Sequence, residues 1–231
     1  MKKVFALLLA LAMMLSLAAC GGNNTPDPGK EDTVITISAG TESTEENLYY
    51  KTLAFFKENV EAATNGAIEV KIYPNSELGD ELSMLEQARS GDLDVVVVGG
   101  GNLASLVPEL QLLSVPYLWT SFENFQKAMD RNSEVWKLLV DTVASKNAGV
   151  SLVAPTTIGS RWVANSKGEI HSPTDMKNLG VTMRIQANPT EATVWTTFGA
   201  NITNMPMTDV FTAMQQGTVD AVENSPEIMY N

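Results

Sequence analysis

Four arginines are the residues of this 231-residue chain that are best suited to holding an anion. They are Arg89, Arg131, Arg161 and Arg184. The planar guanidinium of arginine donates two parallel hydrogen bonds to a carboxylate, an arrangement that the ammonium group of lysine cannot reproduce. Arg184 lies in a predicted strand at residues 181–185, where the plain alternative is an arginine on an edge strand that reaches solvent. Taken alone, the residues favour that alternative.

Residues typical of catalysis are scarce. His171 is the only histidine, which excludes a metal site built from several histidines, and its Glu-Ile-His-Ser-Pro setting indicates a surface loop. The chain contains no Gly-x-Ser-x-Gly motif for a nucleophilic serine. Nothing among the 27 acidic residues marks a catalytic carboxylate pair. We therefore expect no enzymatic activity, cofactor or metal, and keep an exported enzyme such as a hydrolase as the alternative.

The start of the chain has the pattern of an export signal. Lys2 and Lys3 precede an apolar run over residues 4–19, which is shorter than the roughly 20 residues that a membrane-spanning helix needs. Cys20 ends this run after small residues and is the only cysteine, so it has no disulfide partner within the chain. The segment resembles a bacterial lipobox, in which the cysteine is acylated. An ordinary cleaved signal with an incidental Cys20 is the alternative.

We accordingly expect residues 1–19 to be a lipoprotein signal peptide and Cys20 to be the lipidation site. Residues 20–33 contain no large apolar group and predict a flexible tether. The expected location is outside the cytoplasm, on the outer face of the cell membrane through the lipid anchor, or in a periplasm.

The charge balance argues against several classes of partner. The net charge is −12, and loss of Lys2 and Lys3 with the signal leaves 13 basic residues against 27 acidic ones, or −14. Such a surface argues against nucleic acid as a partner and against a polybasic membrane patch. The hydrophobic share of 44% is typical of a globular protein.

The elements that must position any site follow an α/β alternation. In the first half, a capping box at Ser43 and Glu46 predicts the start of a helix that stops at residues 64–66. Strands are predicted at residues 34–38, 68–72 and 94–98, the last buried on both faces, and a second helix near residues 82–88 closes at Gly91. This order predicts a parallel sheet with crossover helices.

The second half repeats the alternation. Helices are predicted at residues 122–129, 134–145, 189–197 and 208–216, and strands at residues 150–153, 161–164, 181–185 and 221–223. A boundary near residues 155–159 predicts two α/β lobes with a cleft between them, the first over residues 34–155 and the second over residues 156–231.

Ten short segments together resemble one protein family. They are residues 64–66, 73–79, 91–94, 107–109, 116–119, 172–177, 183–185, 198–200, 205–207 and 217–224. In this order and spacing they are similar to the solute-binding subunits of tripartite ATP-independent periplasmic (TRAP) transporters, of the DctP type. The resemblance implies a two-lobed fold like that of periplasmic binding proteins. It also implies a receptor that captures a small carboxylate and delivers it to the small and large membrane subunits of a TRAP transporter.

The family continues well past the position of Asn231. The resemblance therefore implies a C-terminally truncated chain in which the second lobe and the helix joining the lobes are incomplete. A truncated product without a transport role is a further alternative.

The resemblance also implies ligand-binding residues. Arg184 stands at the position of the family's carboxylate-binding arginine, and Arg161 matches a second arginine beside the ligand, with a plain ion pair as its alternative. Asn224 matches an asparagine that hydrogen-bonds the ligand, with a turn residue that caps the next helix as its alternative; Ser225 stands where the family usually has proline. Because the acidic body does not attract anions at long range, capture must depend on a locally positive pocket.

Other candidates are more weakly indicated. Glu81 lies near a helix start where some relatives contact the ligand, and Thr41 and Glu42 are expected to face the cleft, although acidic residues there are commonly solvated. Aromatic side chains often line pockets, but core packing is the expected role of two tryptophans and three methionines. These are Trp162, Trp195, Met205, Met207 and Met214.

Overall fold

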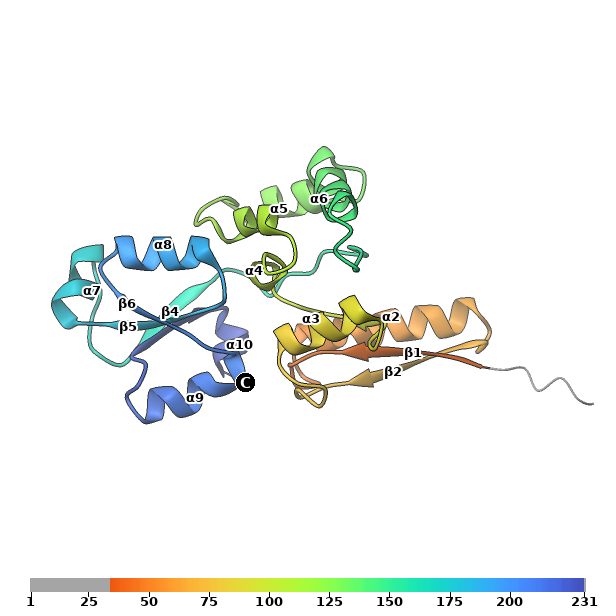
Figure 1. Cartoon of the computed structure of the whole chain (residues 1–231), viewed down its shortest axis with the longest axis horizontal. Helices are drawn as coiled ribbons and strands as arrows, with labels where there is room; N and C mark the ends of the chain where they lie inside the picture. The colour runs from red at the N-terminus through yellow and green to blue at the C-terminus, as the bar shows by residue number, and fades with distance from the viewer. Residues whose placement is uncertain (1–33, 231) are drawn as a thin grey trace, which may run out of the picture. The chain divides into compact units, whose positions relative to one another are not determined.

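The computed structural model describes residues 34–230, so the predicted signal peptide, Cys20 and the predicted tether lie outside the described residues. The described chain is a mixture of helices and strands that form two β-sheets and, between them in sequence, a group of helices (Figure 1). The predicted α/β class is confirmed. No helix among these residues is long and apolar enough to cross a lipid bilayer.

The first sheet has three parallel strands in the order β2-β1-β3. Its elements are β1 (Ile35–Gly40), α2 (Leu48–Ala63), β2 (Ile68–Tyr73), α3 (Glu81–Ser90) and β3 (Val95–Val96). Ala39, Leu53 and Val70 form its buried core. The predicted parallel sheet with crossover helices is therefore present. The prediction for residues 94–98 was wrong in extent: only two residues pair, and they are half-buried, because β3 is an edge strand beside β1 alone.

Helix α2 begins later than the capping box predicted. Asn47 is the N-cap residue, and its side chain accepts a hydrogen bond from the Tyr49 N–H at 2.9 Å. Ser43 instead lies in the loop after β1, where its carbonyl oxygen accepts a hydrogen bond from the Asn75 N–H. Asparagine caps a helix as effectively as serine, so the residues allowed either start and the packing of the loop decided between them.

The middle of the chain is helical. It comprises α4 (Gly100–Leu103), the 3₁₀ helix η1 (Pro108–Ser114), α5 (Phe122–Met129) and α6 (Glu134–Ser145). The helices predicted at residues 122–129 and 134–145 are confirmed as α5 and α6, with the predicted bounds. The predicted strand at residues 150–153 was wrong: Val150 and Leu152 pack against the core of these helices, and residues 150–153 pair with no strand in the described part of the chain.

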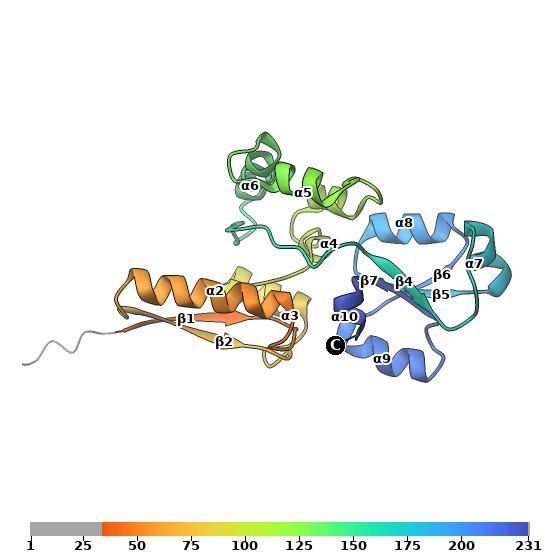
Figure 2. The same ribbon diagram turned by 180° about the vertical axis from the view of Figure 1, so that it is seen from behind.

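The second sheet has the strand order β4-β7-β5-β6, with β4 antiparallel to β7 and the other pairs parallel. Its elements are β4 (Trp162–Asn165), α7 (Pro173–Leu179), β5 (Thr182–Ile185), α8 (Pro189–Thr197), β6 (Asn201–Asn204), α9 (Met207–Gln215), β7 (Ala221–Asn224) and α10 (Pro226–Tyr230). Helices α8 and α9 lie on opposite sides of the sheet (Figures 1 and 2). The residue patterns did not predict α7, β6 or α10.

Both sheets direct the carboxyl ends of parallel strands toward one region. Glu42 follows β1, Gln186 follows β5, and Asn224 ends β7. Ligands of open α/β sheets bind beyond the carboxyl ends of the strands, where loops carry variable side chains on a rigid support. A ligand site is therefore expected where these three strand ends meet.

Candidate ligand-binding cavity

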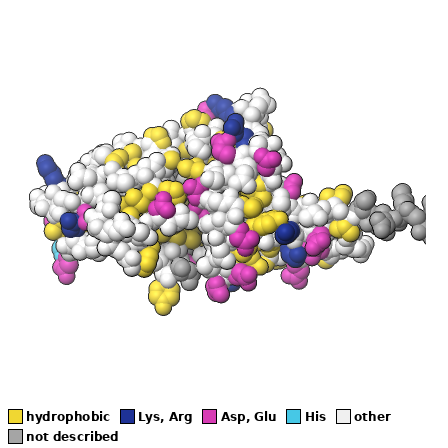
Figure 3. Space-filling view, turned by 60° about the horizontal axis from the view of Figure 1, so that its bottom comes forward, with side chains coloured by type: hydrophobic (Ala, Val, Ile, Leu, Met, Phe, Trp, Pro, Cys, Tyr) yellow, Lys and Arg dark blue, Asp and Glu magenta, His cyan; other side chains and the backbone are white. Residues whose placement is uncertain are grey.

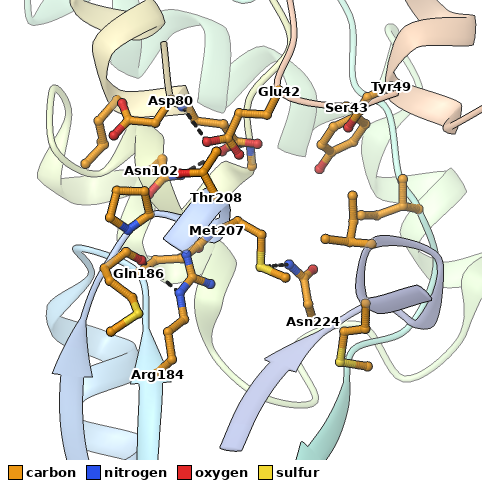
Figure 4. A pocket seen from close by; sticks show the side chains of 18 of the residues that line it. Glu42, Ser43, Tyr49, Asp80, Asn102, Arg184, Gln186, Met207, Thr208 and Asn224 are labelled. Carbon is orange, nitrogen blue, oxygen red and sulfur yellow. Dashed lines mark hydrogen bonds between the residues drawn. The ribbon is translucent and has the colours of Figure 1, made fainter. Parts of the chain in front are cut away.

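A cavity of about 550 Å³ lies at these strand ends (Figure 4). Its polar lining comes from both sheets and from the N-terminus of α3. The polar lining residues include Glu42, Tyr49, Asp80, Glu81, Asn102, Arg161, Arg184, Gln186 and Asn224. Apolar side chains complete the wall, among them Ile158, Met205, Met207, Phe211, Ile228 and Met229. A volume of this size suits a small organic molecule.

Arg184 is buried yet has no ion-pair partner among the described residues. Its side chain rises from β5 into the cavity, and the residue is only 4% exposed (Figure 4). Its Nε donates a hydrogen bond to the carbonyl oxygen of Met205 at 2.9 Å, while Nη1 and Nη2 donate to no described residue. Burial lowers the pKa of this guanidinium, which remains a cation at neutral pH. A buried cation without a partner is costly, so the site is organised for an incoming anion.

Two glutamates, Glu42 and Glu81, form an acidic part of the wall. Glu42 lies on the side of the cavity opposite to Arg184 (Figure 4). The carboxylate of Glu42 accepts a hydrogen bond from the Glu81 N–H at 3.0 Å, and Glu81 accepts from the Gly99 N–H at 2.8 Å and from Asn102 Nδ2 at 2.6 Å. Burial, reinforced by the charge of Glu81, raises the pKa of Glu42 to about 7. Burial also raises the pKa of Glu81.

A third buried carboxylate, Glu191, does not line the cavity but binds the backbone of the lining residue Gln186. It lies in the first turn of α8 and accepts a hydrogen bond from the Gln186 N–H at 2.9 Å. Burial raises the pKa of Glu191, while the positive charges of Arg161 and Arg184 oppose that rise. Gln186 is thereby held at the end of β5 with its side chain in the cavity wall.

Asn188 connects the second sheet to the helical middle of the chain. Its Oδ1 caps helix α8, and its Nδ2 donates to the Gly101 carbonyl oxygen at 3.1 Å and to Ser114 Oγ at 3.0 Å. At Gly101, an added Cβ would overlap Gln186 Oε1 and lie 3.0 Å from Ser114 Oγ. A side chain at position 101 would therefore displace the Gln186 side chain from its place in the cavity wall.

Arg161 lines the cavity but is already paired. Its Nε donates to a carboxylate oxygen of Glu223, its Nη2 donates to the Glu223 carbonyl oxygen at 2.9 Å, and its Nη1 donates to Asn224 Oδ1 at 3.3 Å. Burial lowers the pKa of Arg161, but the hydrogen bond and charge of Glu223 outweigh that effect and raise it overall. The ion pair foreseen as an alternative for Arg161 is present, together with its position at the cavity.

The structure brings five of the six predicted ligand-binding residues to the cavity: Arg184, Arg161, Asn224, Glu81 and Glu42. Thr41 does not line it. That side chain is fully buried, and its hydroxyl accepts a hydrogen bond from the Ser43 N–H at 3.2 Å. Thr41 thus shapes the loop that carries Glu42.

Of the predictions for other side chains, some are confirmed and others are wrong. Trp195 packs in the core of the second sheet, as expected, and His171 lies on the surface. Trp162 is neither core nor cavity, because it is 65% exposed on β4. Met205 and Met207, expected in the core, line the cavity instead, because Met205 directly follows β6 and Met207 begins α9.

Residue patterns did not identify Tyr49, Asn102 or Gln186 as cavity residues. Gln186 directly follows β5, and that position after a parallel strand was the available signal. Asn102 follows three glycines whose role as the start of a short helix was not apparent. Tyr49 lies in the first turn of α2. Burial raises the pKa of Tyr49, so its hydroxyl stays protonated at neutral pH.

Comparison with known proteins defines the class. The family model for bacterial extracellular solute-binding protein, family 7 (DctP), matches residues 39–231. The chain belongs to this family of solute-binding proteins, as the short segments had indicated.

Individual relatives agree with this assignment. The 2,3-diketo-L-gulonate-binding periplasmic protein YiaO of Escherichia coli is 30% identical over 177 residues, which are 76% of this chain and 52% of the relative. The galactonate-bound sugar acid binding protein DctPAm of Advenella mimigardefordensis has a TM-score of 0.78 at 27% identity, covering 84% of this chain and 61% of the other. A succinate-bound TRAP periplasmic solute-binding protein of Sulfurospirillum deleyianum also has a TM-score of 0.78 at 27% identity, covering 86% and 62%. The chain thus spans about half the length of the curated relatives that it matches.

Proposed function

We propose that this chain binds a small organic acid outside the cytoplasm and delivers it to the membrane subunits of a TRAP transporter. The observation that carries the proposal is the buried guanidinium of Arg184, whose Nη1 and Nη2 donate to no described residue and face a cavity at the strand ends. Relatives that bind 2,3-diketo-L-gulonate, galactonate or succinate support a carboxylate as the ligand.

In the proposed complex, the ligand carboxylate accepts two hydrogen bonds from Nη1 and Nη2 of Arg184. This contact gives both charge neutralisation and orientation, and it gains strength because the surroundings are shielded from water. Arg161 and Asn224 lie at the same cavity and would provide secondary contacts. The acidic side chains spread over the face in Figure 3 and the net charge of −12 do not favour anions at long range, so affinity must come from these local groups.

A ligand screen by isothermal titration calorimetry, backed by thermal unfolding, tests the proposal. The full-length protein is titrated with dicarboxylates, keto acids, aldonates and uronates, and with the uncharged sugars that correspond to the sugar acids. We expect at least one acid to bind at micromolar or tighter Kd and the uncharged sugars not to bind. Equal binding of acids and uncharged sugars, or no binding of any acid, would contradict the proposal.

We propose further that Cys20 carries a lipid that holds the receptor at the membrane, where a tether raises its effective concentration near the permease. The motivation is the signal pattern that ends at Cys20. Metabolic labelling with an alkyne fatty acid should mark the wild-type protein and leave Cys20→Ala unmarked. A labelled Cys20→Ala variant would exclude this attachment site.

The lobe boundary near residues 155–159 is likewise proposed as the hinge for closure around the ligand.

A further inference from the structure

The charged side chains around the cavity are unevenly paired. Among the described residues that line it, three are acidic, namely Glu42, Asp80 and Glu81, and two are arginines. Asp80 is engaged as the N-cap of α3, where it accepts a hydrogen bond from the Ser83 N–H at 2.7 Å. Two carboxyl groups and two guanidinium groups are therefore left to consider as ligand contacts.

Only one of the guanidinium groups forms no ion pair with a carboxylate among the described residues. All three nitrogens of Arg161 donate hydrogen bonds to Glu223 or Asn224, and Glu223 balances its charge. Arg184 forms no ion pair with a described residue. The cavity is therefore complementary to a single ligand carboxylate rather than to two.

The acidic wall has unused hydrogen-bond acceptors. Glu42 uses Oε1 for the Glu81 N–H, and Glu81 uses Oε2 for Gly99 and Asn102. Glu42 Oε2 and Glu81 Oε1 receive no hydrogen bond from a described residue. A ligand hydroxyl satisfies such an oxygen by donating to it, and it can also accept a hydrogen bond when the carboxyl group is protonated. A second ligand carboxylate brings only acceptors, and it adds negative charge beside two carboxyl groups whose ionisation burial already disfavours.

We propose that the ligand is a monocarboxylate that carries several hydroxyl groups, with its carboxylate on Arg184 and its hydroxyls on Glu42 and Glu81. On this view the two glutamates select against dicarboxylates of the same length. The inference rests on the proposed function, since it assigns the chemical class of ligand to the same cavity. Like-charge contacts across a binding site cost enough to reject a wrong partner by about tenfold or more.

Matched pairs of acids test this selectivity in the full-length protein. Each pair has the same carbon chain and hydroxyl arrangement and differs only at the far end, which is CH₂OH in one acid and a carboxylate in the other. Suitable pairs are D-erythronate with meso-tartrate, D-galactonate with galactarate, and D-gluconate with D-glucarate. The titrations are run at about pH 8, above the pKa of about 7 of Glu42, so that this carboxyl group is ionised. We expect the monocarboxylate of the best-bound pair to have a Kd lower by about tenfold or more.

Variants then locate the selectivity. Glu42→Gln and Glu81→Gln keep the oxygen that accepts the existing backbone hydrogen bonds but can no longer ionise. Each should reduce the preference for the monocarboxylate by about tenfold, through weaker binding of the monocarboxylate and tighter binding of the dicarboxylate. Glu58→Gln, on the exposed face of α2, removes the same charge away from the cavity and should leave the ratio unchanged. Because the readout is a ratio of two ligands, a merely less stable variant would not imitate it.

The outcomes separate the inference from the proposed function. Equal or tighter binding of the dicarboxylate in the pairs, or tightest binding of an acid without hydroxyls, would overturn the inference and leave the receptor role intact. An unchanged ratio in both glutamine variants would also overturn it. Failure of every acid in the wider screen would remove the proposed function and the inference together.

Discussion

The Nε of Arg184 donates a hydrogen bond to the carbonyl oxygen of Met205 at 2.9 Å, and this is the one hydrogen bond the guanidinium makes with a described residue. The contact joins the end of β5 to the segment after β6. It fixes the plane of the guanidinium while leaving Nη1 and Nη2 for a ligand. A group held in its bound orientation loses little entropy on binding, which favours affinity.

Arg184→Lys and Arg184→Ala should both weaken binding of the best acid by about 30-fold or more, because each removes the two-pronged contact to the carboxylate. Lysine is expected to rescue little, since it keeps the charge but not the fork. Calorimetry measures the loss, and Arg131→Ala, at an exposed position on the helical middle of the chain, is the matched control. Retained affinity in Arg184→Lys would show that charge alone suffices.

Glu223→Gln should change which acids bind. Removing this carboxylate leaves the charge of Arg161 unbalanced at the cavity. Dicarboxylates are therefore expected to gain affinity by about threefold to tenfold, while monocarboxylates change less. The comparison uses the matched acid pairs, with Glu169→Gln as the control because that side chain is 87% exposed. Loss of affinity for both acids of a pair would instead mark Glu223 as a support for Arg161.

Gly101→Ala should destabilise the protein by about 1–3 kcal/mol and weaken ligand binding, because the added methyl group displaces the buried Gln186 side chain from the cavity wall. Gly100→Ala, one residue earlier in α4, is the matched control. Its Cβ would lie 3.3 Å from the Leu113 Cδ1 atom, which can shift, and alanine is the better helix former. Urea unfolding gives the two free energies. Equal effects at the two positions would refute the role assigned to the close approach at Gly101.

The stability of the protein should depend on pH through Glu42. Its pKa is about 7 in the folded chain and near 4.5 without burial, so between these values the folded state binds more protons than the unfolded state. The free energy of unfolding therefore falls as pH rises from 4.5 to 7. Relative to wild type, Glu42→Gln should gain roughly 2–3 kcal/mol of stability over this interval.

Urea unfolding of both proteins at closely spaced pH values measures this difference directly. Glu58→Gln controls for the removal of one negative charge. A difference between Glu42→Gln and wild type that stays constant with pH would mean that Glu42 ionises normally in the folded chain.

Short-range patterns were sufficient for most of the helices and strands. Helices α5, α6 and α8 begin and end where their caps and apolar spacing predict, since a Ser or Asn N-cap and an amphipathic face act within a few residues. The family could also be recognised from short segments. The importance of Arg184, however, came from that resemblance, because an isolated arginine in a strand gives no sign of being buried.

Long-range packing decided the rest. Val95–Val98 have the composition of a buried strand, yet β3 is a short edge because no further strand joins it. Met205 and Met207 have the character of core residues, yet they line the cavity because burial depends on which distant surface covers a side chain. The contrast between Arg161, which Glu223 neutralises, and Arg184, which no described carboxylate pairs, arises from contacts between strands far apart in the chain. That contrast requires the folded arrangement, because ion pairing depends on distances that residue spacing does not encode.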